Sequence, residues 1–160
     1  MKKWIILVCV VILIAIGFSV NVYFQSTKPL NSAKNYAEKK AKEKANLDSV
    51  DQFYLYNGDE TYYITVGKQT NGEEIAVWIP EKNSNNVTVE KMSDGISKTE
   101  AVNRLKSKVD PTKILGTRLG MLNKEPVWEI SYLDKSSNLN YAYIYFLKNN
   151  NKPPYMITNI

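Results

Sequence analysis

Residues 62–80 have the sequence YYITVGKQTNGEEIAVWIP, and this stretch decides the fold. Two runs rich in β-branched and aromatic residues, 62–66 and 75–79, flank the pair Asn71-Gly72. Such runs favour strands, and an Asn-Gly pair tolerates the positive φ that a tight hairpin imposes. The stretch therefore predicts two antiparallel strands joined by a short turn.

The pattern continues on both sides of this hairpin. Strands are predicted at Val50–Tyr56, which leads into Asn57-Gly58, and at Val87–Met92, after a polar turn. Upstream, a helix is predicted to begin at Asn31 or Ser32. Its apolar face is made of small residues and one tyrosine at helical spacing: Ala33, Tyr36, Ala37, Ala41 and Ala45. The first unit is therefore one helix followed by a four-stranded antiparallel meander.

A second unit of the same kind follows. Ser97-Lys98-Thr99-Glu100 matches a capping box, in which the serine oxygen and the glutamate carboxylate satisfy free backbone donors at a helix start. Asp110-Pro111 is predicted to end this helix. Its buried side is formed by Ala101, Val102 and Leu105. Strands are then expected at Ile114–Leu122, Val127–Leu133, Tyr141–Leu147 and Tyr155–Ile160.

Corresponding elements of the two units are separated by a nearly constant distance along the chain. The helix starts at Asn31 and Ser97 differ by 66 positions, and the second strands at Tyr62 and Val127 differ by 65. A tandem repeat explains this spacing, and coincidental alternation of elements is the alternative. We predict an α+β protein with a membrane anchor and connector at 1–28, a first module at 29–93 and a second module at 94–160.

Residues 4–24 form an uncharged stretch of 21 residues that is apolar throughout from Ile5 to Gly17. A helix of this length spans roughly 30 Å, the thickness of the hydrocarbon core of a bilayer. A cleaved signal peptide is the alternative, but its apolar region is usually shorter, about 7–15 residues, and ends at a small-x-small site. We predict an uncleaved, single-pass transmembrane helix.

The net charge of +5 lies mainly beside this predicted span. From Leu47 onward there are 13 basic and 14 acidic residues, so the distal body is nearly neutral. A nucleic-acid partner is therefore not expected, because its binding needs a basic surface on the folded body. Basic residues flank the span almost equally, so charge counting alone leaves the orientation open.

The residue inventory argues against several kinds of catalytic and metal site. The sequence has no histidine, and its one cysteine, Cys9, lies in the apolar stretch. Ser-His-Asp triads, thiolate-imidazole pairs and His- or Cys-ligated zinc are thus excluded. Glu129 and Asp134 could form a carboxylate pair of a surface hydrolase. We favour the alternative, that Glu129 alternates to the polar face and Asp134 opens a turn. No catalytic, metal or cofactor site is predicted.

The aromatic residues are more informative about function than the carboxylates. Trp128 and Tyr132 share one face of their predicted strand, and the next strand alternates tyrosines with apolar residues. One side of a helix-covered sheet is left free, and it must be solvated, packed on the sister module or docked on a partner. Core packing is the simpler account. The candidate partner surface consists of Trp128, Tyr132, Tyr141, Tyr143 and Tyr145.

Four stretches of the chain resemble one known family: 62–67 (YYITVG), 77–80 (VWIP), 95–97 (GIS) and 127–134 (VWEISYLD). They are similar to the TseB-like (YpmB) group of membrane-anchored proteins, built from two PepSY-like, cystatin-like modules. The order of anchor, helix, meander, helix, meander corresponds along essentially the whole chain. The last hairpin departs from the pattern, because residues 148–154 replace a compact turn.

The resemblance implies a non-enzymatic regulator of cell-wall (peptidoglycan) elongation in a Gram-positive bacterium, acting beside a penicillin-binding protein. It also implies a cytoplasmic N-terminus and an extracytoplasmic body. A second implication, from the PepSY likeness, is an inhibitor or chaperone-like modulator of a cell-surface protease. The sequence leaves the oligomeric state open.

Overall fold

A computed structural model describes residues 12, 16, 18 and 28–158. The chain divides into two compact units, residues 1–36 and 37–160. The predicted anchor, 4–24, lies outside the described residues except for positions 12, 16 and 18, which are helical and exposed. Within the described part of the chain, no helix combines the length and the apolar character needed to cross a membrane.

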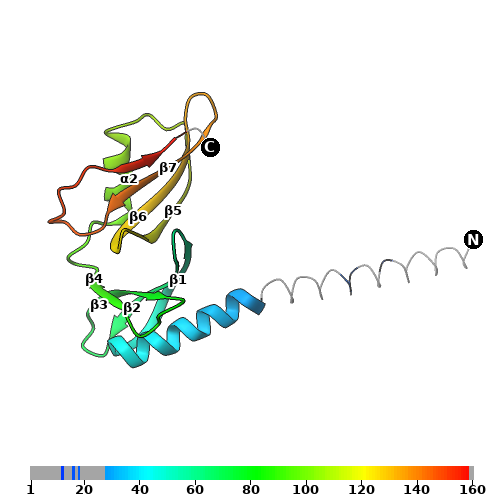
Figure 1. The fold of residues 1–160 in the computed structure, drawn as a ribbon, viewed down its shortest axis with the longest axis vertical. Helices are drawn as coiled ribbons and strands as arrows, with labels where there is room; N and C mark the ends of the chain where they lie inside the picture. The colour runs from blue at the N-terminus through cyan, green and yellow to red at the C-terminus, as the bar shows by residue number, and fades with distance from the viewer. Residues whose placement is uncertain (1–11, 13–15, 17, 19–27, 159–160) are drawn as a thin grey trace, which may run out of the picture. The chain divides into compact units, whose positions relative to one another are not determined.

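The first sheet is the predicted antiparallel meander (Figure 1). It contains β1 (Leu47–Asn57), β2 (Thr61–Gln69), β3 (Glu74–Pro80) and β4 (Thr88–Lys91), in that spatial order. Residues 28–45, which precede it, are helical.

The second sheet repeats this order with β5 (Lys113–Leu122), β6 (Glu125–Leu133), β7 (Leu139–Tyr145) and β8 (Tyr155–Ile157). It is preceded by α2 (Lys98–Lys106). Two antiparallel four-stranded sheets, each packed with a helix, confirm the predicted α+β class and fit tandem cystatin-like modules. The module boundaries at 28/29 and 93/94 stay predictions.

One face of the first sheet packs on the helical residues 37–45. The helix contributes only alanines, which let its backbone approach the sheet closely, while the sheet contributes larger apolar side chains. Tyr36, also expected on this face, is 38% exposed. The buried cluster consists of Ala37, Ala41, Ala45, Leu47, Ile75, Val77 and Ile79.

Helix α2 starts as the sequence predicts but ends earlier. Ser97 Oγ accepts a hydrogen bond from the Glu100 backbone N–H at 3.1 Å, as in a capping box. The Glu100 carboxylate, however, pairs with Arg104 one turn along the helix, at 2.7 Å. The helix ends at Lys106, four residues before the predicted stop at Asp110. The Ser107 hydroxyl donates to the Arg104 carbonyl at this end.

The two Asn-Gly pairs behave differently. Gly72 has a φ of +85° and donates its N–H to the Gln69 carbonyl, so the turn at Asn71-Gly72 is the one predicted. Asn57 and Gly58 keep negative φ, and residues 58–60 join β1 to β2. The positive φ that an Asn-Gly pair tolerates is therefore not used in this loop, where the Gly58 N–H donates to the Glu60 carbonyl at 3.4 Å.

The other face of the first sheet shares a single core with the second sheet. The Trp78 indole N–H donates to the Gly120 carbonyl of β5 at 2.9 Å, and the Trp78 ring meets Phe146 edge to face at 5.6 Å. The Tyr56 ring lies against Gly120 so closely that an added Cβ would come within 2.6 Å of it. The sequence left open whether this face is solvated or packed. The structure shows that it packs on the sister module.

The segment between the modules, 92–97, is hydrogen-bonded to both sheets. The Met92 N–H donates to the Glu74 carbonyl at 2.9 Å, and the Ile96 N–H donates to the Phe146 carbonyl at 2.7 Å. Gly95 pairs with residue 147 and has the Phe146 ring where a Cβ would stand. Gly95 and Ile96 are buried, so this part of the connection belongs to the core and the segment is not a free linker.

We expect Gly120→Ala to lower the free energy of unfolding by about 1–3 kcal/mol, because its Cβ would overlap the Tyr56 ring. Urea unfolding would measure this. Gly116→Ala in the same strand is the matched control, since its nearest obstacle is the adjustable Ser131 hydroxyl at 3.1 Å. In a Tyr56→Ala background the cost of Gly120→Ala should shrink. An unchanged cost there would contradict the proposed contact.

Candidate functional site

Strand register divides the predicted aromatic surface between two faces of the second sheet. Trp128 lies opposite Ile144, while Glu129 lies opposite Tyr143. Directly opposed residues share a face, so Trp128 and Tyr132 point one way and the tyrosines of β7 point the other. The five residues therefore do not form one continuous surface.

Trp128 and Tyr132 lie in the core. Trp128 is buried, donates its indole N–H to the Ile96 carbonyl at 2.9 Å just before α2, and lies 6.5 Å from the Phe146 ring. Tyr132 is also buried on the same face. Core packing, the simpler account, explains these two side chains.

The three tyrosines of β7 differ from one another. Tyr143 is buried, whereas Tyr141 and Tyr145 are half-buried at the edge of the core. The Lys152 ammonium lies 5.3 Å from the Tyr145 ring centroid, a cation–π geometry. The set as a partner surface stays a prediction, and only Tyr141 and Tyr145 keep appreciable accessible surface.

A polar cluster, buried except at Arg118, whose side chain is 43% exposed, lies on the face of Tyr143. The Glu129 side chain is 6% exposed and pairs with the Arg118 guanidinium at 2.7 Å. The Tyr143 hydroxyl donates to Glu129, and Tyr56 hydrogen-bonds to Tyr143. Arg118 also lies 5.9 Å from the Tyr56 ring centroid. We call Tyr56, Arg118, Glu129 and Tyr143 the tyrosine–glutamate cluster.

Burial changes the acidity of both phenols in this cluster. Desolvation, reinforced by the Glu129 charge, raises the pKa of Tyr56 to about 12. The same two causes, in the same order, raise the pKa of Tyr143 further above its ordinary value. Both phenols therefore stay protonated at neutral pH and act as hydrogen-bonding groups, not as bases.

Glu129 and Asp134 do not form a hydrolytic pair. Asp134 Oδ1 accepts backbone hydrogen bonds from Ser136 at 2.8 Å and Asn138 at 3.0 Å, so it opens the turn after β6 as predicted. The Asn138 N–H is the main cause that lowers the pKa of this carboxyl. Glu129 does alternate to the face opposite Trp128, but that face is buried and not solvated, because Tyr56 and Tyr143 cover it.

Beside the cluster is a groove of about 490 Å³ that we call the tyrosine groove. It combines aromatic and aliphatic side chains with three short polar ones. Its lining consists of Tyr56, Asn57, Gly58, Asp59, Met121, Leu122, Asn123, Tyr143, Tyr155 and Ile157. Sequence reasoning found only Tyr143 of this set, because the others come from separate strands and turns that only the fold brings together.

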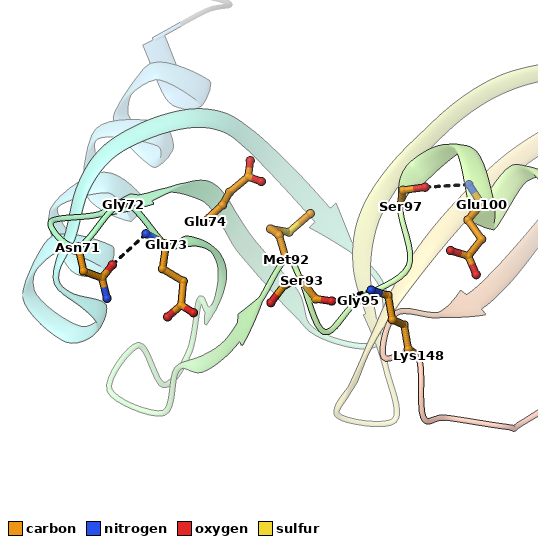
Figure 2. A pocket seen from close by; sticks show the side chains of 10 residues that line it. All are labelled: Asn71, Gly72, Glu73, Glu74, Met92, Ser93, Gly95, Ser97, Glu100 and Lys148. Carbon is orange, nitrogen blue, oxygen red and sulfur yellow. Dashed lines mark hydrogen bonds between the residues drawn. The ribbon is translucent and has the colours of Figure 1, made fainter.

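A second hollow, the acidic cleft, has a volume of about 890 Å³. Figure 2 shows Glu73 and Glu74 toward one end, Glu100 and Lys148 toward the other, and the segment 92–95 between them. Most of its charges are already engaged. Glu73 pairs with Lys91 at 2.8 Å, and Glu100 pairs with a helix neighbour.

The Lys148 ammonium donates to the Ser93 carbonyl at 2.7 Å, so it too is engaged within the acidic cleft. Among residues 12, 16, 18 and 28–158, no group of three or more Cys, Asp or Glu side chains is placed to hold a metal ion. The site chemistry that the described residues offer is therefore aromatic stacking and hydrogen bonding.

Comparisons with known proteins agree with the family resemblance found in the sequence. Residues 36–80 match the model of the "Cell wall elongation regulator TseB-like domain". The chain is 25% identical over 137 residues to the probable cell wall elongation regulator TseB of Bacillus subtilis (strain 168), covering 86% of this chain and 85% of that protein. The solved structure of the YpmB protein from Bacillus subtilis superposes with a TM-score of 0.69 at 25% identity, covering 77% of this chain and 96% of that one. The resemblance inferred from the sequence is confirmed.

We expect Arg118→Met to lower the free energy of unfolding by about 1–3 kcal/mol, because the buried Glu129 carboxylate would lose its charged partner. Lys135→Met is the matched control, since its pair with Asp110 is solvent-exposed and should contribute nothing measurable. Chemical denaturation of both variants checks this. Equal, negligible effects would refute a stabilising role for the Arg118–Glu129 pair.

Stability should also fall in alkali as a result of the raised phenol pKa values. A phenol whose folded-state pKa exceeds its unfolded value near 10 stabilises the fold below that pH, and the contribution is lost as pH rises toward the folded value. The free energy of unfolding should therefore decline between about pH 10 and pH 12. Replacing Tyr56 and Tyr143 by Phe should flatten this decline. An identical alkaline slope in the double variant would contradict the assignment.

Proposed function

We propose that this chain, which is similar to the TseB-like family over most of its length, is a membrane-anchored regulator of cell-wall elongation. It acts outside the cytoplasmic membrane by associating with a penicillin-binding protein, and it catalyses no reaction of its own. The observation that carries the proposal is the 25% identity over 137 residues to a probable cell wall elongation regulator. The likeness to a solved relative at 25% identity supports the fold on which this assignment rests.

The site chemistry is consistent with binding in place of catalysis. The buried carboxylate Glu129 is neutralised by Arg118, and the two phenols beside it remain protonated at neutral pH. The Arg118 guanidinium binds Glu129 through Oε1, which gives this carboxylate a structural partner within the cluster. A domain that regulates by contact needs a rigid body with accessible surface. The core shared by the two sheets provides such a body.

The predicted anchor at 4–24 places the proposed activity at the membrane. Its uncharged length suits a single span, and the family resemblance favours an N-terminus in the cytoplasm and a body outside. Wall synthases attached to the same membrane would then meet the chain by diffusion in two dimensions. A raised effective concentration of this kind lets a modest contact area support regulation.

Site-specific photo-crosslinking in growing Gram-positive cells tests the proposal. A photoreactive residue would replace Glu74 in the acidic cleft, Asp59 at the tyrosine groove, or Lys135 on an exposed turn as control. We expect a penicillin-binding protein to be captured from Glu74 or Asp59 but not from Lys135. Removing the chain should also change the rate of wall incorporation during elongation.

Recovery of no wall-synthesis enzyme from any position, with the full-length chain present in the membrane, would refute the proposed association. Capture from all three positions with equal yield would also count against it. Two proteins that are close in the membrane without a defined contact surface would give that result.

A further inference from the structure

The tyrosine groove is assembled from four parts of the fold. The end of β1 and its loop supply residues 56–59, the end of β5 and its turn supply 121–123, and β7 and β8 supply Tyr143, Tyr155 and Ile157. Its volume of about 490 Å³ lies within the range of roughly 300–1,000 Å³ that is typical of small-ligand sites. The groove is therefore large enough for one ligand segment.

Two of the tyrosines that line the groove are buried and held in place, and the third is exposed. Tyr143 is held by the hydrogen bond to Glu129, and Tyr56 is held by its close contact with Gly120. Tyr155 is 52% exposed, and its ring centroid lies 5.9 Å from that of Tyr143. An exposed ring that lies against a buried one offers a flat apolar surface at little entropic cost.

The rim of the groove carries short polar groups. Asn57, Asp59 and Asn123 are all exposed, and an amide side chain both donates and accepts hydrogen bonds. The side-chain oxygen of Asn57, Oδ1, already accepts a hydrogen bond from the Thr61 hydroxyl at 3.2 Å, which orients the amide. The lining thus combines flat aromatic rings with polar groups that can hydrogen-bond to hydroxyl and acetamido groups of a ligand.

The charges of the lining residues restrict further the kind of ligand that the groove can bind. None of the described lining residues is a lysine or an arginine, and the nearby Arg118 is engaged by Glu129. Phosphorylated and other anionic ligands would therefore lack a free cation. Asp59 is the one acidic lining residue, which is a weak attraction for a strongly cationic ligand. A neutral ligand with apolar C–H faces and many hydroxyl and amide groups fits best.

We propose that the tyrosine groove binds the glycan backbone of peptidoglycan, a neutral chain of N-acetylated sugars. The C–H face of a pyranose ring packs on Tyr155, and the rim amides hydrogen-bond to acetamido and hydroxyl groups. This inference rests on the proposed function, because that role places the body beside growing wall. It adds a second contact, to the product of the synthase and not to the synthase itself.

Binding of the full-length chain in detergent is measured by calorimetry with a neutral oligomer of four N-acetylglucosamine units, and by retention on purified peptidoglycan. We expect the wild-type chain to bind both. Tyr155→Ala should weaken binding about tenfold or more, whereas Tyr155→Phe, which keeps the ring, should stay within about threefold. Asn123→Gly should weaken binding about threefold to tenfold without straining the backbone, since residue 123 has a φ of +50°.

Tyr36→Ala is the matched control, because Tyr36 is exposed on the helix of residues 28–45 and does not line the groove. Its binding should equal that of the wild type. Thermal unfolding of each variant shows whether a loss of binding follows a loss of folding, and Tyr155→Phe supplies a folded reference at the same position.

The inference would be overturned if the wild-type chain bound neither the N-acetylglucosamine oligomer nor the purified peptidoglycan. Unchanged binding by Tyr155→Ala would overturn the assignment to this groove. If Tyr155→Ala instead abolished crosslinking to a wall synthase while the wild type bound no glycan, the groove would be a protein site and the inference would be wrong. If the proposed function is wrong, no crosslinks to a wall-synthesis enzyme form from any position. The calorimetric result does not depend on that crosslinking experiment.

Discussion

The close approach of Tyr56 and Trp78 to Gly120 is the contact on which the rest of the structure depends. A side chain at position 120 would occupy the space of the Tyr56 ring, and the Gly120 carbonyl would lose its place beside the Trp78 indole N–H. Because only a bare backbone fits between the two sheets at this point, one apolar core extends through both. Interiors are packed too densely for such a contact to be adjusted independently of its neighbours.

Several features of the site follow from this contact. Tyr56 reaches Tyr143 and Arg118 because β1 is held against the second sheet. Glu129 and the two phenols of the tyrosine–glutamate cluster are buried for the same reason. The tyrosine groove lies where the loop after β1 comes beside β5, β7 and β8. A protein of this size gains from such sharing, since a single small module buries too little apolar surface to be very stable. Binding surface and folding core are therefore built from the same side chains.

The sequence predicted more of the fold than of the site. Strand and helix patterns have periods of two and 3.6 residues, so both meanders and the start of α2 at Ser97 were predicted correctly. The end of α2 was not, because the chain leaves the helix after Lys106 through a turn in which the Lys108 and Val109 N–H groups both donate to the Leu105 carbonyl. Of the candidate aromatic residues, Tyr143 lines the groove while Trp128 is in the core. Periodicity assigns a residue to a face but does not say what covers that face.

By itself the sequence determined the α+β class, the repetition of a helix-plus-meander unit, and the resemblance to TseB-like proteins. The class and the repetition depend on local alternation, turn residues and spacing, which are properties of neighbouring positions in the chain. The resemblance depends on the four matching stretches of sequence. Only the tertiary structure decided that the two units share a core, that Glu129 is buried against Arg118, and that Tyr155 stands beside Tyr143 at an open groove. Each of these depends on residues far apart in the chain, whose proximity arises from packing one sheet on another.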